Sequence, residues 1–218
     1  MNEKSVVLLS SGLDSTVNFW LEAQRGRAVL ALTFDYGQRA ASREIERARA
    51  LADRAGVRHQ SLDLKWFREF TRTSLVSASM QVPTGSQVQI DDLAQSEQTA
   101  KSVWVPNRNG IFLSIAAAFA EGLGAQVIVP GFNLEEASTF PDNTQAYMES
   151  VTASLRFSTA NQVRVECATV GMQKTEIVEL GRKLKAPFDL MWPCYLGEEK
   201  PCGECESCQR FRRAGGWT

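Results

Sequence analysis

The sequence predicts a doubly wound α/β fold with a mostly parallel, five-stranded, Rossmann-like sheet and a C-terminal cysteine-rich appendage. Short apolar runs alternate with helical patterns at the spacing of strand–helix–strand units, which places helices on both faces of a sheet. The length of 218 residues suits one such domain with a small addition. Four of the five cysteines fall between positions 194 and 208, which predicts the appendage.

Each strand is predicted from a short apolar run, and each helix from apolar residues that recur on one face. Val17, Trp20 and Leu21 have that spacing in the first helix, and Gly56 ends the second. The stretch IFLSIAAAFA is apolar nearly all round, which predicts a buried helix. The predicted strands are 5–10, 27–37, 59–64, 125–131 and 162–170, and the predicted helices are 14–25, 42–55, 107–124, 143–157 and 174–184.

The alternation stops over residues 71–103, which are polar, small and irregular. An irregular stretch of this length inside a compact domain is usually a functional lid or a mobile loop. We therefore expect a principal α/β domain over residues 1–190, interrupted by a mobile lid or loop at 71–103. The cysteine-rich segment over 191–218 follows it.

Composition argues against two classes of protein. The formal net charge of −1 counts against a broad electrostatic contact with nucleic acid, and the arginines of RFRRAGG are interpreted as a solvated last helix. No apolar run approaches the roughly 18 residues of a membrane span, and the N-terminus lacks a signal-peptide pattern. We therefore expect a cytoplasmic protein without membrane contact. The single histidine, His59, is expected to be structural.

The stretch SSGLDST (10–16) lies where the first strand is predicted to give way to a helix. Backbone N–H groups and the dipole at a helix N-terminus favour an anion, and Gly12 allows a ligand to approach the backbone closely. This is not a Walker loop, because no lysine follows the glycine. An ordinary N-cap turn would have similar residues. Asp14 favours a phosphate site, because a carboxylate beside a phosphate calls for a cation such as Mg²⁺.

The second motif, WPCYLGEEKPCGECESCQR, has four cysteines with short spacers. In a cytosolic chain such clustering indicates a metal before it indicates disulfides. Four thiolates form a tetrahedral Zn²⁺ site without an open position, so the zinc would be structural. An iron–sulfur cluster would use the same ligand type, and four free cysteines are the remaining alternative. The predicted ligands are Cys194, Cys202, Cys205 and Cys208.

Two further loops follow strands or precede helices at the expected ligand edge of the sheet. Arg108 in VPNRNG stands at a helix start, where its charge opposes the dipole, so an anion would be its natural partner. The asparagines beside it could simply be helix caps. The loop GFNLEEASTFPDNT offers Glu136 and Asp142, which belong either to a solvated acidic loop or to the site.

Taken in order, SSGLDS, FDYGQR, VPNRN, KTEIVELG and the cysteine block resemble the 7-cyano-7-deazaguanine synthase family, a branch of the PP-loop ATP pyrophosphatases. The resemblance covers nearly the whole chain and is weakest over 71–103. The cysteine block and KTEIVELG make it specific. It implies a PP-loop, adenine nucleotide alpha hydrolase-like form of the fold, with ATP bound by residues 1–190, zinc by 191–218, and a homodimer.

The resemblance also implies a reaction. ATP and Mg²⁺ would adenylate the carboxylate of 7-carboxy-7-deazaguanine, and ammonia would displace AMP to give an amide. A second activation and dehydration would give the nitrile of the queuosine and archaeosine pathways. Adenylation needs placement and charge neutralisation more than a protein nucleophile, which suits a chain without a Ser-His-Asp arrangement.

Residue roles are implied by the same resemblance. Asp14, Lys174 and Arg108 would be catalytic, and the four cysteines match the family's zinc ligands. The implied nucleotide ligands are Ser10, Ser11, Gly12, Leu13, Asp14, Ser15, Arg39 and Arg108. The residues implied for the substrate are Phe132, Asn133, Glu136, Phe140, Asp142 and Lys174.

The sequence departs from the family pattern at several of these places. Ser11 replaces a glycine of the phosphate loop, Ala40 replaces a histidine, VPNRN replaces VPGRN, and the substrate loop reads EASTFPDNT where the family has D-x-SGYPDCR. Three alternatives therefore stay open. They are a paralogue that forms an amide with another amine, such as one on a partner protein in a defence system, a PP-loop enzyme that modifies tRNA, and a non-enzymatic, zinc-clamped binding module.

Overall fold

The computed structural model describes residues 3–77, 79–92 and 99–217. Within these ranges the chain forms one sheet of five parallel strands in the order β3-β2-β1-β4-β5, which confirms the predicted doubly wound α/β fold. The strands are β1 (Ser5–Leu8), β2 (Ala28–Asp35), β3 (His59–Asp63), β4 (Val127–Val129) and β5 (Arg164–Val165). β4 and β5 are shorter than predicted. β4 stops before Pro130, which lacks an N–H group, and β5 pairs with β4 alone.

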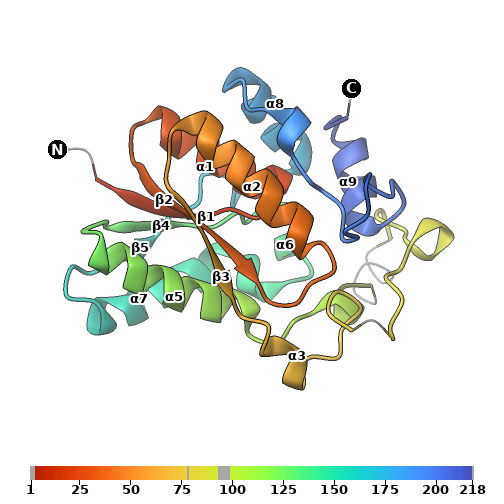
Figure 1. Cartoon of the computed structure of the whole chain (residues 1–218), viewed down its shortest axis with the longest axis horizontal. Coiled ribbons are helices and arrows are strands. Elements are labelled where there is room, and N and C mark those ends of the chain that lie inside the picture. The colour runs from red at the N-terminus through yellow and green to blue at the C-terminus, as the bar shows by residue number, and fades with distance from the viewer. Residues whose placement is uncertain (1–2, 78, 93–98, 218) are drawn as a thin grey trace.

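Helices cover both faces of the sheet (Figure 1). Two of them pack on one face and two on the other, while α8 packs on α1 and α9 packs on α8. The long helices are α1 (Leu13–Gln24) and α2 (Ala41–Ala55) on the first face, α5 (Arg108–Gly122) and α7 (Gln145–Ser158) on the second, and α8 (Lys174–Lys183) and α9 (Glu206–Arg213) beyond them. The short elements are α3 (Phe67–Phe70), α6 (Leu134–Ala137) and the 3-10 turns Gly85–Gln87, Pro141–Asn143 and Phe188–Leu190. Among the described residues, none of the helices combines the length and apolar character that crossing a membrane requires.

The core lies on both faces of the central strands, because successive side chains of a strand point in opposite directions. Val6 belongs to the cluster under α5 and α7, while its neighbour Val7 belongs to the cluster under α1 and α2, and both are fully buried. Helix α5 was expected to be buried all round. It buries one face, including Leu113, and leaves Ser114 and Ala118 exposed, since small residues need no burial to be tolerated in a helix.

The cysteine-rich segment packs on the domain. Phe211 of α9 joins a buried cluster with Leu13 of α1 and Ile177 of α8. The predicted solvated face of α9 holds for Arg212 and Arg213, which are exposed, but is wrong for Arg210, which is 8% exposed and forms ion pairs with Glu135 and Glu206. A charge within such a network can be buried because each group is paired. The division at residue 190 stays a prediction.

Residues 71–103 have little regular structure where they are described. Thr84 forms an antiparallel bridge with Cys205, and Gly85 donates a backbone hydrogen bond to Glu204, so part of the segment lies along the cysteine loop. Residues 78 and 93–98 lie outside the described ranges, and a lid function for the segment stays a prediction. His59 begins β3, and its ring contacts the Thr33 hydroxyl at 2.9 Å, which agrees with a structural role.

The close approach of two loops at the end of the sheet generates a stability prediction. A Cβ atom on Gly131 would lie 2.6 Å from the Ser15 backbone nitrogen and 2.8 Å from its Cα. Because backbone atoms cannot move aside like a side chain, Gly131→Ala should lower the free energy of unfolding by about 1–3 kcal/mol, measured by urea denaturation. Gly122→Ala is the matched control, since open space surrounds that glycine. Equal unfolding midpoints for the two variants would contradict this packing.

Candidate active site

A cavity of about 260 Å³ lies at the carboxyl ends of the central strands. β1 has β2 on one side and β4 on the other, so the strand order reverses here, which is where open α/β sheets bind ligands. Motifs that are far apart in the sequence meet at this cavity. The predicted residues in its wall are Ser10, Gly12, Leu13, Asp14, Ser15, Arg108, Phe132, Glu136, Phe140, Asp142, Lys174 and Cys194.

The loop between β1 and α1 has the geometry of an anion site. Gly12 is the N-cap residue of α1, and no described side chain provides the cap hydrogen bond. The ordinary N-cap interpretation of SSGLDST therefore does not hold. Ser10 and Ser15 place their hydroxyl oxygens 3.0 Å apart at the start of the helix. The N–H groups of the first turn and the positive end of the dipole lie at the cavity without a side-chain cap.

Ser11 has a left-handed backbone, with φ of 63°, and is fully buried. This conformation explains why the family pattern has glycine here, since a Cβ atom strains it. The Ser11 hydroxyl donates to the Ser10 carbonyl, and the Ser11 carbonyl accepts a hydrogen bond from the Trp192 N–H at 2.8 Å. In this arrangement the Ser11 side chain faces backbone rather than the cavity, and the loop is tied to the C-terminal segment.

Lys174 joins two acidic residues of the cavity. Its ammonium lies 2.8 Å from Asp14 Oδ2 and 2.8 Å from Glu136 Oε1. Burial opposes the ammonium charge, but the two carboxylates outweigh it and raise the pKa of Lys174. Burial prevails at Asp14 and raises its pKa, whereas at the more exposed Glu136 it is outweighed by Lys174, which lowers that pKa. Asp14 Oδ1 is buried without a hydrogen-bond partner in the described chain.

Arg108 enters the cavity from the first residue of α5. The preceding Asn107 has φ of 50°, a left-handed conformation that asparagine tolerates better than most residues, so it can stand where the family has glycine. The Arg108 guanidinium lies over the Tyr36 ring, 5.7 Å from its centroid. Asp142 also lines the cavity, and burial raises its pKa against the opposing effect of Arg108.

Three of the residues predicted to contact nucleotide or substrate lie outside the cavity wall, namely Ser11, Arg39 and Asn133. The Arg39 guanidinium donates hydrogen bonds to the backbone carbonyls of Ser74 and Ser77, at 2.8 and 2.9 Å, so it holds the 71–103 segment. Asn133 is fully buried and caps α6, because its Oδ1 atom accepts a hydrogen bond from the Glu136 N–H at 3.0 Å. Asn133 thereby positions Glu136, while direct ligand contact by Asn133 and Arg39 stays a prediction.

Other cavity residues were missed by sequence reasoning. Trp104 stacks with Phe140 at a centroid distance of 6.0 Å and an interplanar angle of 7°. Glu44 of α2 also lines the cavity, and burial raises the pKa of its carboxyl to about 7. The only sequence signal for Glu44 was its place shortly after FDYGQR, at the predicted ligand edge. Trp104 lies just before the VPNRN motif, and the sequence around it contains no pattern that indicates a functional role.

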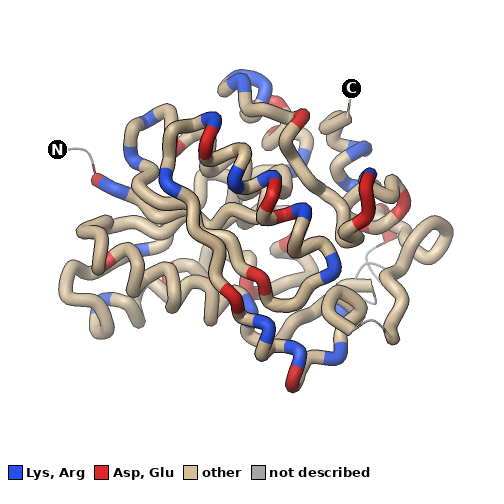
Figure 2. The backbone as a smooth tube through the Cα atoms, viewed as in Figure 1, with Lys and Arg blue, Asp and Glu red and all other residues tan. Residues whose placement is uncertain are grey.

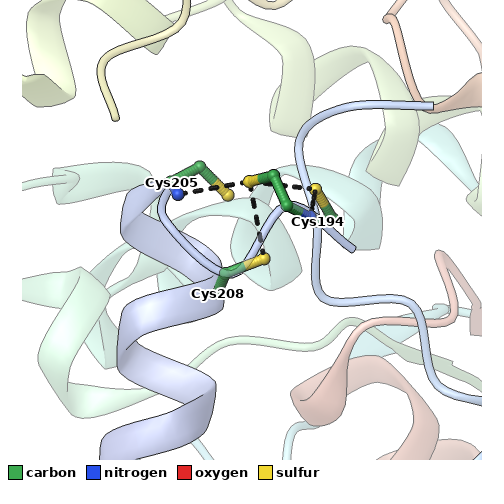
Figure 3. A group of neighbouring side chains, drawn as sticks. Cys194, Cys205 and Cys208 are labelled. Carbon is green, nitrogen blue, oxygen red and sulfur yellow. Dashed lines mark hydrogen bonds between the residues drawn. The ribbon is translucent and has the colours of Figure 1, made fainter. Parts of the chain in front are cut away.

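The four predicted metal ligands come together as expected. Their sulfur atoms all lie within 4.8 Å of one another, with Cys194–Cys202 at 3.5 Å and Cys202–Cys208 at 4.0 Å. Figure 3 shows the Cys194 side chain on a loop converging with those of Cys205 and Cys208 at the start of α9. Tetrahedral zinc with Zn–S bonds of about 2.3 Å separates its sulfurs by about 3.8 Å, so the cluster fits a zinc ion.

Comparison with known proteins gives full-length matches. A family model described as "Queuosine biosynthesis protein QueC" matches residues 4–218. The "7-cyano-7-deazaguanine synthase" of Bdellovibrio bacteriovorus is 55% identical over 98% of this chain and 93% of its own length. The protein of the same name from Pelotomaculum thermopropionicum is 50% identical over 97% and 96%. Among solved structures, NMN synthetase from Francisella tularensis has a TM-score of 0.49 at 18% identity, covering 92% of this chain and 71% of the other.

The Lys174 cluster predicts a pH-dependent stability change. Lys174→Met would leave the carboxylates of Asp14 and Glu136 without their cation, so it should lower the free energy of unfolding at pH 7 by about 3 kcal/mol. The unpaired carboxyls would then bind protons more tightly when folded than when unfolded. The loss should therefore shrink as the pH falls toward 4, measured by urea denaturation.

Lys183→Met, at an exposed position of the same helix, is the matched control and should change stability little. A Lys174→Met penalty that does not vary with pH would contradict the ion cluster.

Proposed function

The chain belongs to the QueC family of queuosine biosynthesis proteins, and from that membership we propose that it is a 7-cyano-7-deazaguanine synthase. It is an enzyme that forms carbon–nitrogen bonds with ATP. It converts 7-carboxy-7-deazaguanine and ammonia to the nitrile through an adenylated carboxylate and an amide. The observation that carries the assignment is the match over residues 4–218, and it supports this reading over the amide-forming, tRNA-modifying and non-enzymatic alternatives.

Residues 10–15 hold the ATP phosphates in this proposal. Support comes from the uncapped start of α1, which offers backbone N–H groups to the cavity. Mg²⁺ fits beside them, because Asp14 Oδ1 is a buried carboxylate oxygen without a partner in the described chain, and bound there the ion would neutralise the leaving pyrophosphate. Lys174 keeps Asp14 oriented toward the phosphates through its ion pair.

The far wall of the cavity receives the carboxylic acid. Trp104 and Phe140 offer parallel aromatic faces for a planar heterocycle, and Phe132 lies nearby in the same wall. Asp142 accepts hydrogen bonds from the N–H groups of such a ring, and Arg108 binds the carboxylate that is to be adenylated. The acceptors and the cation thus fix the acid in a position to attack the α-phosphate.

The cysteine cluster holds a structural zinc ion in this proposal. Its four sulfurs leave the metal no open position, so zinc would act on the fold rather than on the substrate. Cys194 lines the cavity and Trp192 bonds to Ser11, so fixing this segment would fix one wall of the site. A homodimer remains a prediction from the family.

The distribution of charge agrees with a small-molecule substrate. Acidic and basic residues are interspersed over most of the chain visible in Figure 2. A protein that binds tRNA through its backbone normally presents a basic face. Together with the net charge of −1, this observation gives the tRNA-modifying alternative no support.

The activity can be tested directly. Wild-type protein incubated with ATP, Mg²⁺, 7-carboxy-7-deazaguanine and ammonium should release AMP and give the nitrile, identified by mass spectrometry. Asp14→Asn should reduce the rate by about 100-fold or more, because a charge that holds Mg²⁺ and Lys174 is lost. Asp189→Asn, at an exposed residue paired with Arg54, should retain full activity. Release of AMP without nitrile would instead favour the amide-forming enzyme, and a complete lack of AMP would favour a binding module.

The zinc site gives a second test. Purified protein should contain about one zinc ion per chain by elemental analysis. Cys208→Ser should lose most of this zinc and lower the midpoint of thermal unfolding by about 5 °C or more, because metal binding contributes to folding. Cys167→Ser, which changes a cysteine outside the cluster, should keep the metal. Zinc retention by Cys208→Ser would remove that residue from the ligand set.

A further inference from the structure

Glu44 reaches the cavity from the first turn of α2. Its Oε2 atom accepts a hydrogen bond from Gln38 Nε2 at 2.8 Å, and Gln38 Oε1 accepts one from the Tyr36 N–H at 3.0 Å. The carboxylate is therefore fixed to the end of β2, on one side of β1. Asp14 lies after β1, Glu136 lies after β4, and Lys174 is the first residue of α8. Glu44 therefore occupies a different part of the cavity wall from these three ion-paired residues.

Glu44 also differs from Asp14 and Glu136 in its charge environment. Asp14 and Glu136 are each paired with the Lys174 ammonium, whereas Glu44 has no ion pair in the part of the chain that the structure describes. The ionisable groups that act on it are Arg108 from α5 and Asp35 from β2, and Tyr36 lies beside it.

The pKa of Glu44 suits the transfer of a proton to or from a ligand near neutral pH. Burial raises the pKa of Glu44 to about 7, the Gln38 hydrogen bond and Arg108 oppose this, and Asp35 adds to it. A general base is most effective when its pKa lies near the working pH, because it is then both available and strong enough to take the proton. Asp142 also lacks an ion pair among the described residues, but it lies on the loop proposed for the heterocycle and accepts a hydrogen bond from Asn143.

Resting on the proposed function, we propose that Glu44 binds the ammonium ion and deprotonates it, so that ammonia is formed inside the cavity. The Glu44 carboxylate takes one proton from ammonium and becomes a carboxylic acid. The lone pair of the ammonia nitrogen forms the bond to the carbonyl carbon of the adenylate. The bond from that carbon to the phosphate oxygen breaks, its electron pair leaves with AMP, and the extra proton on the new amide nitrogen passes to solvent.

The physical need for such a group follows from the chemistry of the amine. Ammonium is the main form at neutral pH and has no lone pair, so it cannot attack a carbonyl carbon. A carboxylate inside the cavity attracts the cation and then removes the proton that blocks attack. The carboxylates of Asp14 and Glu136 are poorly suited to this, because the Lys174 ammonium already pairs with one oxygen of each and the other oxygen of Asp14 is proposed to hold Mg²⁺.

Two half-reactions separate this role from nucleotide binding. Adenylation is measured as the exchange of labelled pyrophosphate into ATP, an exchange that requires 7-carboxy-7-deazaguanine. Amide formation is measured with ammonium and, separately, with hydroxylamine, whose nitrogen is neutral at pH 7. Glu44→Gln should keep the exchange rate within about 3-fold of wild type. It should reduce amide formation from ammonium at pH 7 by about 100-fold, while the reaction with hydroxylamine stays near the wild-type rate.

The pH profile gives a readout that a purely structural role would not produce. The wild-type rate with ammonium should rise through about pH 7 and then level off as the ionisation of Glu44 becomes complete. The Glu44→Gln rate should keep rising with pH, because it depends on free ammonia in solution. Glu46→Gln, an exposed change on the same helix, is the matched control and should behave as wild type.

Two results would overturn the assignment. If Glu44→Gln lowers pyrophosphate exchange as much as amide formation, Glu44 serves nucleotide binding or the fold. If the reactions with ammonium and hydroxylamine fall equally, Glu44 does not act on the protons of the amine. A wild-type protein without any exchange would refute the proposed synthase activity itself, which distinguishes that failure from the failure of the Glu44 role.

Discussion

The buried ammonium of Lys174 is the interaction on which the site depends. It lies 2.8 Å from carboxylates that follow two different strands, so it holds α1 and α6 against the start of α8. The backbone N–H of Lys174 also donates to Glu135, which pairs with Arg210 of α9 at 3.0 Å. One chain of ion pairs and a backbone hydrogen bond therefore runs from the loop at the start of α1 to the cysteine-rich helix. Removing one member of such a buried network leaves its partners without compensation, which couples the parts of the site to one another.

The topology explains why this network forms at the end of the sheet. In a parallel sheet the carboxyl ends of all strands lie at one edge, and the reversal of strand order beside β1 leaves a gap there. The loop after β4 approaches the loop after β1 so closely that only glycine fits at position 131. The phosphate loop, the acidic loop and Lys174 are then within contact distance, although they are far apart in the sequence.

Two departures from the family pattern fall at positions where this chain has a left-handed backbone. Ser11 and Asn107 stand where the family has glycine, and both adopt the left-handed conformation that glycine adopts easily. Non-glycine residues are strained there, and such strain persists where the surrounding structure determines the backbone. The backbone of Ser11 is held in part by the hydrogen bond from the Trp192 N–H, which joins this loop to the C-terminal segment.

The fold class, the cavity loop at the start of α1 and the close cysteine cluster were predictable from local sequence patterns. Strand–helix alternation follows from apolar periodicity, and the short spacers between cysteines place their sulfurs together. Which polar side chains face the cavity depends on contacts between distant segments, and these became visible in the folded chain. Arg39 contacts the 71–103 segment and Asn133 caps α6. Arg210 is buried, and Glu44 lines the cavity. The positions of these side chains depend on partners from distant segments, and a local sequence pattern does not predict which distant charges pair.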